Sequence, residues 1–282
     1  MDPVLECSGD DAAGHCNSVG RVIAPRFFVW TGRELAETPD VPAHDGVFVA
    51  DSWLVADGGV RALQLHRDRF LRGVASQTSI DATAAEGFWQ AAVDALPHTG
   101  EWFPRVEALR TDAGPTLAFR LRPAPPLGAS VRVASLDEGD PRTVATVKGP
   151  DLDRLVALKR EAAQNDVDEP IIVSAAGHVV DGATSAVLWW RGERLFAPSA
   201  SLSRVDSVTA KSIRLLATAT GITTGEEFAA PADLSGCEVW VVNALHGIRV
   251  VTSWRNGPTL GRTAGRAAAW QRRLDALVRP LP

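Results

Sequence analysis

A proline-rich segment near the middle of the chain limits its fold more than any other feature. Residues 123–126 contain three prolines, and Gly128 follows shortly after them. Proline has no amide hydrogen to donate to a helix or an inner strand, so this density favours an extended, stiff connector. The sequence therefore predicts a linker over residues 123–129, with one folded unit before it and another after it.

Size and composition agree with two soluble folded units. The chain has 282 residues, of which 45% are hydrophobic and 22% are charged, a balance typical of globular proteins with an ample core. The net charge is −5 and the basic residues are scattered, so we expect no nucleic-acid partner. No apolar run is long enough to span a membrane and no secretory signal is present, so we expect a cytoplasmic protein without a membrane partner.

The N-terminal segment and the cysteines carry little structural signal. Residues 1–20 are small and polar and show no periodicity, which predicts a loose extension. Cys7, Cys16 and Cys237 are too far apart for a disulfide framework and lack the four-ligand spacing of a zinc site. We therefore expect no metal.

Periodicity predicts mixed structure on both sides of the linker. Residues 21–122 combine strand patterns with two helix patterns and form a predicted α+β domain; Thr83 and Glu86 resemble a capping box at the start of the second helix. Residues 130–282 form the predicted second domain, in which a helix begins near Gly149-Pro150. This helix should bury Leu152, Leu155, Val156 and Ala162, and Asn256-Gly257 is typical of a hairpin turn.

Two residues around that helix suggest covalent chemistry. Lys148 ends a β-like run beside the expected interdomain cleft, where burial would lower its pKa and favour Schiff-base formation. Asp181 follows 33 positions later, in a turn and strand context where a carboxylate could pair with a protonated ring nitrogen. Each residue alone also fits an ordinary surface lysine or a solvated turn aspartate. Lys159 is a rival anchor, but it lies mid-helix.

Other candidates could bind anions. Val208 and Thr209 begin a helix after Ser207, where free amides and the helix dipole favour phosphate, although a plain N-cap fits as well. Arg69 lies one turn after His66 on a helix and could reach the same anion, although a solvated helix arginine fits as well. Arg120 and Arg122 are two positions apart on a strand, so either could clamp a substrate carboxylate or form a structural ion pair.

Taken in order, these motifs resemble a known family. They are Gly46-Val47-Phe48, His66-Arg67-Asp68-Arg69, Lys148, the segment 181–186 in place of Glu-Gly-x-x-Ser-Asn, Val208-Thr209 and Asn243-Ala244-Leu245. Over roughly residues 44–254 the chain resembles the class IV, or fold type IV, pyridoxal 5'-phosphate (PLP) enzymes. That family includes branched-chain and D-amino acid aminotransferases, (R)-amine transaminases and aminodeoxychorismate lyase.

The resemblance implies a fold, a cofactor and a site. The fold would be α+β with two domains, a smaller N-terminal α/β domain and a larger C-terminal domain with a mixed, β-barrel-like sheet, assembled as a homodimer. Lys148 would hold PLP covalently and Asp181 would face its ring nitrogen. The remaining implied contacts are Arg69, Thr184, Val208, Thr209, Asn243 and Ala244 for the cofactor, and Arg120, Arg122 and Val49 for the substrate.

The sequence also departs from the family pattern. Asp181 replaces the usual glutamate and is one methylene shorter, and Ala186 replaces the usual asparagine. Val49-Ala50 stand where many members carry Glu-Thr, and the chain contains no tyrosine. Substrate choice is the property that these departures affect most.

Three functions are therefore compatible with the sequence. The first is transamination from a D-amino acid or (R)-amine to a keto acid, favoured over branched-chain L-amino acids by the altered pocket positions. The second is aminodeoxychorismate lyase activity, suggested by Asn243-Ala244-Leu245. The third is a binding module that has kept the fold without catalysis.

Overall fold

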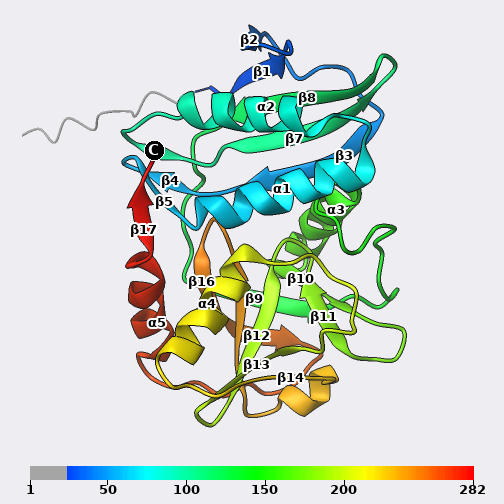
Figure 1. Ribbon diagram of the computed structural model, residues 1–282. Helices are drawn as coiled ribbons and strands as arrows, with labels where there is room; N and C mark the ends of the chain where they lie inside the picture. Colours follow the sequence, from blue (N-terminus) through cyan, green and yellow to red (C-terminus); the bar gives the residue numbers. More distant parts are fainter. Residues whose placement is uncertain (1–23) are drawn as a thin grey trace, which may run out of the picture.

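The computed structural model describes residues 24–282. The predicted extension, together with Cys7 and Cys16, lies outside the described residues. The first half of the chain builds an antiparallel five-stranded sheet in the order β2-β1-β8-β7-β3 (Figure 1). Its strands are β1 (Arg26–Trp30), β2 (Leu35–Thr38), β3 (Gly46–Ser52), β7 (Arg105–Thr111) and β8 (Gly114–Leu121).

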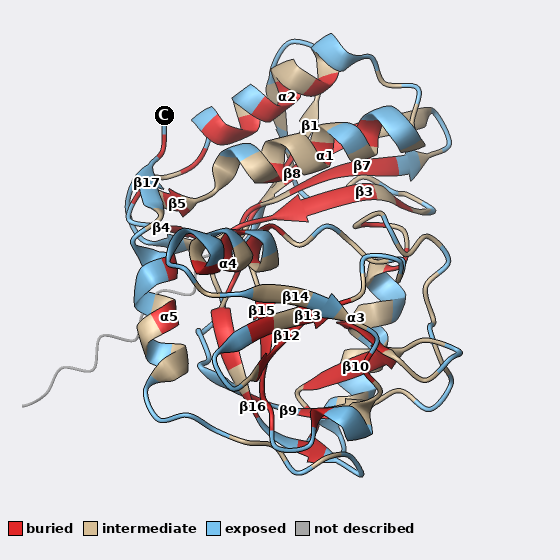
Figure 2. Cartoon of the chain, turned by 60° about the horizontal axis from the view of Figure 1, so that its bottom comes forward, coloured by how far each residue is buried: buried red, intermediate tan, exposed pale blue. Residues whose placement is uncertain are grey.

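Two helices complete the core of this half. In α1 (Leu63–Gln77) the residues His66, Phe70 and Val74 are buried, and α2 (Ala82–Asp94) buries Phe88 and Trp89 against them. Apolar residues at this spacing form one stripe on a helix, which explains why both helices dock on the sheet. In Figure 2 the inner strands of this half are mostly buried, whereas the helices carry exposed residues on their outer sides.

The predicted capping box of the second helix is wrong. The N-cap of α2 is Asp81, whose carboxylate accepts from the Ala84 amide at 2.9 Å. Aspartate is a better cap than threonine, and it stands two positions before Thr83. Glu86 does not reach back to the cap but forms an ion pair with Arg67 of α1.

A small sheet brings the C-terminus back to the first half. Its order is β17-β5-β4-β6, formed by β4 (Val55–Ala56), β5 (Gly59–Arg61), β6 (Glu101–Trp102) and β17 (Val278–Pro280). The hairpin predicted at Asn256-Gly257 is wrong, because no strand follows that turn until β17. The next residues instead bond to the chain before β15: the Gly261 amide donates to the Cys237 carbonyl at 2.9 Å.

The second half forms a mixed, curled eight-stranded sheet, as predicted, in the order β11-β10-β9-β16-β15-β12-β13-β14. Its strands are β9 (Ser130–Ser135), β10 (Glu169–Val173), β11 (Val179–Gly182), β12 (Ala186–Arg191), β13 (Arg194–Pro198), β14 (Thr224–Glu227), β15 (Glu238–Asn243) and β16 (Gly247–Arg255). β10 and β16 lie parallel to β9, whereas β15 is antiparallel to β16 and β12.

Helices contribute to the burial of both faces of this sheet. On one face α4 (Val208–Ala219) and α5 (Arg266–Asp275) pack on Trp190 and Trp240, and a short 3-10 helix (Pro231–Leu234) lies against the other face. Both faces are therefore buried, which explains why β12 and β15 read as continuous apolar runs. Within residues 24–282, no helix is both long and apolar enough to cross a membrane.

The helix α3 (Leu152–Ala163) differs from its prediction. It was expected to bury an apolar stripe, but none of its residues is fully buried. Leu152, Leu155 and Val156 instead line a cavity between the two sheets. Amphipathic spacing shows that a helix has an apolar face, but it does not distinguish a core from a cavity wall.

Candidate active site

A cavity of about 340 Å³ lies between the first half of the chain and the eight-stranded sheet. This is within the size range of small-molecule sites. Nine of the eleven predicted site residues line it: Arg69, Arg122, Lys148, Asp181, Thr184, Val208, Thr209, Asn243 and Ala244. The other two, Arg120 and Val49, are not among its lining residues.

Lys148 is held at the cavity by its own backbone. Its carbonyl accepts from the Ala50 amide of β3 at 2.7 Å. The following Gly149 has φ +147°, and a Cβ there would lie 2.7 Å from the Val49 Cα, so only glycine allows this close approach. Burial, followed by the positive charge of Arg69, lowers the pKa of the Lys148 amine to about 8. A substantial fraction of the Lys148 amine is therefore neutral, and so nucleophilic, near neutral pH.

Asp181 is a buried carboxylate with a free oxygen. It lies in β11 opposite Ile172 of β10, and its Oδ2 is 3.6 Å from Nη1 of Arg142. Its Oδ1 has no hydrogen-bond partner within the described residues. Burial raises the pKa of Asp181 to about 8, against the lowering effect of Arg142. An unpartnered buried oxygen of this kind favours a protonated ligand atom at its side of the cavity.

The N-terminus of α4 offers amide donors to the cavity. The Ser207 hydroxyl caps the helix by accepting from the Ala210 amide at 3.3 Å. The amides of Val208 and Thr209 come earlier in the first turn and have no acceptor within a helix. Since both residues line the cavity, this end of α4 is suited to an anion.

Arg69 approaches the N-terminus of α4, but its guanidinium is already paired with the carboxylate of Asp51. Its Nε and Nη2 donate to the Asp51 carboxylate at 2.8 and 2.7 Å, and Nη1 donates to the Asp206 carbonyl at 2.9 Å. Asp51 also contacts the His66 ring at 2.8 Å. Arg69 therefore links α1 to the loop before α4 while it still lines the cavity.

Comparison with known proteins places this geometry in a family. The family model for amino-transferase class IV matches residues 48–254, which is most of the chain. The chain belongs to the class IV aminotransferase family. A comparison with curated protein sequences finds no match.

Solved class IV structures share the fold. A fold IV transaminase from Curtobacterium pusillum has a TM-score of 0.73 at 20% identity, covering 89% of this chain and 97% of its own. A hypothetical aminotransferase from Mycobacterium tuberculosis in a PLP-bound form gives 0.74 at 22%, with 90% and 98% covered. A branched-chain aminotransferase from Thermoproteus uzoniensis with norvaline gives 0.75 at 18%, with 91% and 99% covered.

The residues of this class IV chain fit the cofactor of the family, PLP. A PLP molecule needs an amine for its aldehyde, an acid for its ring nitrogen and donors for its phosphate. The cavity presents Lys148, the free Oδ1 of Asp181 and the α4 N-terminus for these three parts.

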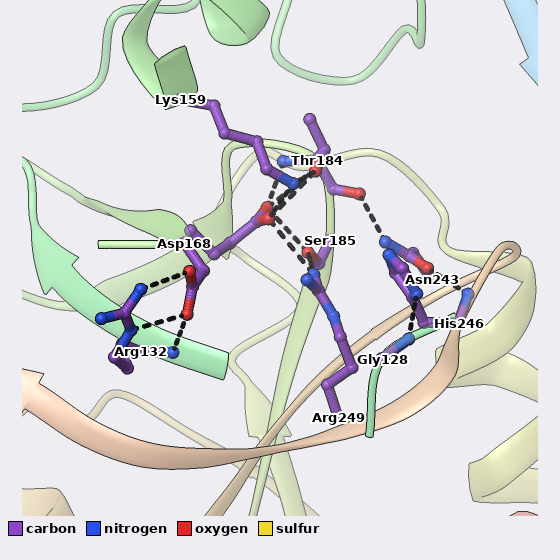
Figure 3. Close-up of polar contacts among 10 residues, drawn as sticks. Gly128, Arg132, Lys159, Asp168, Thr184, Ser185, Asn243, His246 and Arg249 are labelled. Carbon is purple, nitrogen blue, oxygen red and sulfur yellow. Dashed lines mark hydrogen bonds and ion pairs between the residues drawn. The ribbon is translucent and has the colours of Figure 1, made fainter. Parts of the chain in front are cut away.

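Thr184 supports a buried network rather than standing free in the cavity (Figure 3). The Glu169 carboxylate accepts from the Thr184 amide at 2.6 Å, from Ser185 Oγ at 2.7 Å and from Lys159 Nζ at 2.8 Å. The Thr184 hydroxyl at 2.9 Å and Arg249 Nη2 at 3.2 Å also donate to this carboxylate. Burial would raise the pKa of Glu169, but Lys159 and Arg249 lower it. Lys159, the rival anchor, is therefore engaged in an ion pair.

The turn after β15 carries a neutral histidine. Asn243 Oδ1 accepts from the His246 amide at 2.9 Å, and Nδ1 of His246 accepts from the Gly128 amide of the predicted linker at 3.1 Å. Burial, with help from Arg249 and Lys159, lowers the pKa of His246 to about 4. A neutral ring that accepts at Nδ1 must carry its proton on Nε2.

The two candidate clamp arginines have different surroundings. Arg120 lies in β8 opposite Arg105, and both pair with the buried Glu107, which is the structural alternative that the sequence left open. Arg122 lies one residue beyond β8 and lines the cavity; its Nε donates to the Phe103 carbonyl at 3.1 Å. Arg122 forms no ion pair among residues 24–282. Burial and the neighbouring Arg105 lower its pKa to about 10.

Val49 faces the core instead of the cavity. A bulge between Val47 and Val49 shifts the pairing of β3 with β7, and the Val49 side chain packs against Gly73 of α1.

Sequence reasoning also missed Asp51, Glu107 and Arg142. For Asp51 a signal existed, because it is the one acid within the apolar strand pattern of residues 46–55. A buried acid in such a strand needs a cationic partner elsewhere.

Proposed function

We propose that this class IV enzyme is a transaminase that moves the amino group of a D-amino acid to a keto acid, with an (R)-amine as the alternative donor. The observation that carries the proposal is the Arg122 guanidinium, which lines the Lys148 cavity without an acid partner in the described residues. Glu107 pairs with Arg105 and with Arg120, and no acid among residues 24–282 pairs with Arg122. A cavity wall with this surplus of positive charge favours a carboxylate.

When bound, PLP withdraws electrons from the carbon that bears the amino group and so acidifies its proton. Lys148 would hold the cofactor and, once the donor has displaced it, take up and return that proton. With a pKa of about 8, the amine is close to the range in which a base works well near neutral pH. Asp181 would keep the ring nitrogen protonated, and Val208, Thr209 and Arg69 would hold the phosphate.

The charge of Arg122 favours a donor with a carboxylate. A hydrogen bond to a charged group contributes about 1.5–3 kcal/mol, which corresponds to roughly 10- to 150-fold in affinity at about 1.4 kcal/mol per tenfold. A D-amino acid and a keto acid both present this carboxylate, whereas a simple (R)-amine does not. Lys148 would move the proton from its own side of the cavity, so the side to which Arg122 draws the carboxylate would decide the hand of the donor.

A steady-state comparison of two variants tests the proposal. Arg122→Met should raise KM for D-alanine and for the keto acid at least about tenfold, and should leave KM for (R)-1-phenylethylamine nearly unchanged. Arg120→Met is the matched control, because Arg120 is engaged by Glu107 and does not line the cavity. Turnover of L-alanine but not D-alanine would show that the proposed hand is wrong. Equal effects of Arg122→Met on KM for D-alanine, for the keto acid and for (R)-1-phenylethylamine would show that Arg122 does not bind the carboxylate.

Aminodeoxychorismate lyase activity is the second candidate. The observation that favours it is the turn Asn243-Ala244-Leu245, which lines the cavity beside the His246 ring. A lyase would release pyruvate from aminodeoxychorismate without a keto-acid acceptor. Release of pyruvate together with no amino transfer from any D-amino acid would replace the transaminase proposal.

A further inference from the structure

Arg142 touches three segments that surround the cavity. It lies six positions before Lys148, and only 4% of its side chain is exposed. Its Nε and Nη2 pair with the Asp140 carboxylate at 2.9 and 2.8 Å, and Nη2 also donates to the Ser203 carbonyl at 2.9 Å. Its remaining terminal nitrogen, Nη1, is the one that lies 3.6 Å from Asp181 Oδ2.

The segment that carries Arg142 is itself fixed near Lys148. The Asp151 carboxylate accepts from the Thr143 amide at 2.9 Å, from the Thr143 hydroxyl at 2.7 Å and from the Val144 amide at 3.0 Å. Asp151 stands three positions after Lys148, so residues on both sides of the lysine hold this loop. The approach of Arg142 to Asp181 is therefore set by the same local structure that places Lys148.

Arg142 opposes the neutralising effect of burial on Asp181. The cations around it are Arg142 and Arg204, and the nearby acids are Glu169 and Asp140. Burial of the carboxylate favours its neutral form, and Arg142 is the largest opposing influence on its pKa. An ionised carboxylate is the form that pairs with a protonated ring nitrogen.

We propose that Arg142 is a positioning residue, which holds the carboxylate of Asp181 by one oxygen so that its free Oδ1 serves the ring nitrogen of the cofactor. Through Ser203 the same guanidinium also ties the acid to the loop that leads to Ser207 and the phosphate end of the site. This inference rests on PLP binding and is independent of which donor the enzyme uses.

Cofactor affinity of the stripped protein tests the inference. Arg142→Met and Arg142→Lys are titrated with PLP between pH 6 and 9, and binding is followed by the visible absorbance of the cofactor and by tryptophan fluorescence. At pH 7.5 we expect Arg142→Met to bind PLP at least about tenfold more weakly, as for one pKa unit of lost interaction. The rise of PLP affinity with pH should also lie about one pH unit higher in Arg142→Met than in the wild type. Arg142→Lys keeps the charge and should lie between them.

Two further arms separate positioning from a general structural effect. In an Asp181→Asn background, Arg142→Met should weaken binding less than about threefold, because the group that it serves is already absent. Pyridoxal, which lacks the phosphate, should show the same relative loss as PLP in the Arg142→Met variant. Arg132→Met is the matched control, since Arg132 also pairs with two acids but does not line the cavity.

Three results would overturn the inference. One is an equal loss of affinity with and without the Asp181→Asn change. Another is a loss seen with PLP but not with pyridoxal, which would assign Arg142 to the phosphate loop alone. The third is an unchanged affinity in a folded Arg142→Met protein, as judged by its near-ultraviolet circular dichroism. Donor screening is unaffected by any of them, so the proposed transaminase reaction stands or falls separately.

Discussion

The depressed pKa of Lys148 predicts how its reactivity depends on pH in the cofactor-free protein. With a pKa of about 8, about 1% of the amine is neutral at pH 6, about 10% at pH 7 and about half at pH 8. An amine with the ordinary lysine pKa of about 10.4 would be roughly 0.04% neutral at pH 7. The cavity should therefore make Lys148 more than about 100-fold richer in free amine at neutral pH.

Competitive labelling measures this directly. Trace acetic anhydride is applied to the stripped protein between pH 6 and 10, and acetylation of each lysine is read by peptide mass spectrometry. Labelling of Lys148 should rise about 50-fold from pH 6 to pH 8 and then only about twofold more up to pH 10. Lys211 of α4 is exposed and reports on the reagent at each pH. A continued tenfold rise per pH unit between pH 8 and pH 10 at Lys148 would refute the reasoning.

Three further predictions concern stability, each measured by urea unfolding of the cofactor-free protein. Gly149→Ala should lower the free energy of unfolding by about 1–3 kcal/mol from backbone strain alone. The loss should exceed that of Gly177→Ala, because Gly177 also has positive φ but has open space around it. Equal losses would show that the close contact of Gly149 with β3 is unimportant. Asp51→Asn should cost about 3–5 kcal/mol by leaving Arg69 without its buried partner, and a loss below about 1 kcal/mol would contradict this. Asp181→Asn should stabilise the protein more at pH 8 than at pH 5. The folded Asp181 pKa of about 8 exceeds that of an unfolded carboxyl, so the wild type loses up to about 1.4 kcal/mol per pH unit between pH 4 and pH 8; a pH-independent difference would contradict this.

Local sequence patterns were sufficient for the two helices of the first half, for the helix after Gly149-Pro150 and for the likeness to class IV enzymes. A lysine, the helix after it and an acid 33 positions later belong to one stretch of chain, and the structure brings Lys148 and Asp181 to one cavity. The strand expected to end at Lys148 is wrong, because residues 136–151 form a loop without a strand. The start of α4 at Val208 was also readable, because Ser207 caps it. Such signals come from backbone geometry within one or two turns of chain.

Only the tertiary structure decided which partner each charged side chain has. Arg120 and Arg122 look equivalent in the sequence, yet Glu107 from the neighbouring strand engages Arg120, while Arg122 lies beyond the strand end at the cavity. Arg142 gave no signal, since its role depends on Asp181, 39 positions away in the chain. Burial and charge pairing are set by contacts between distant segments, and no local period records them. The sequence therefore determined where the reactive groups stand along the chain, and the fold determined which of them face one another.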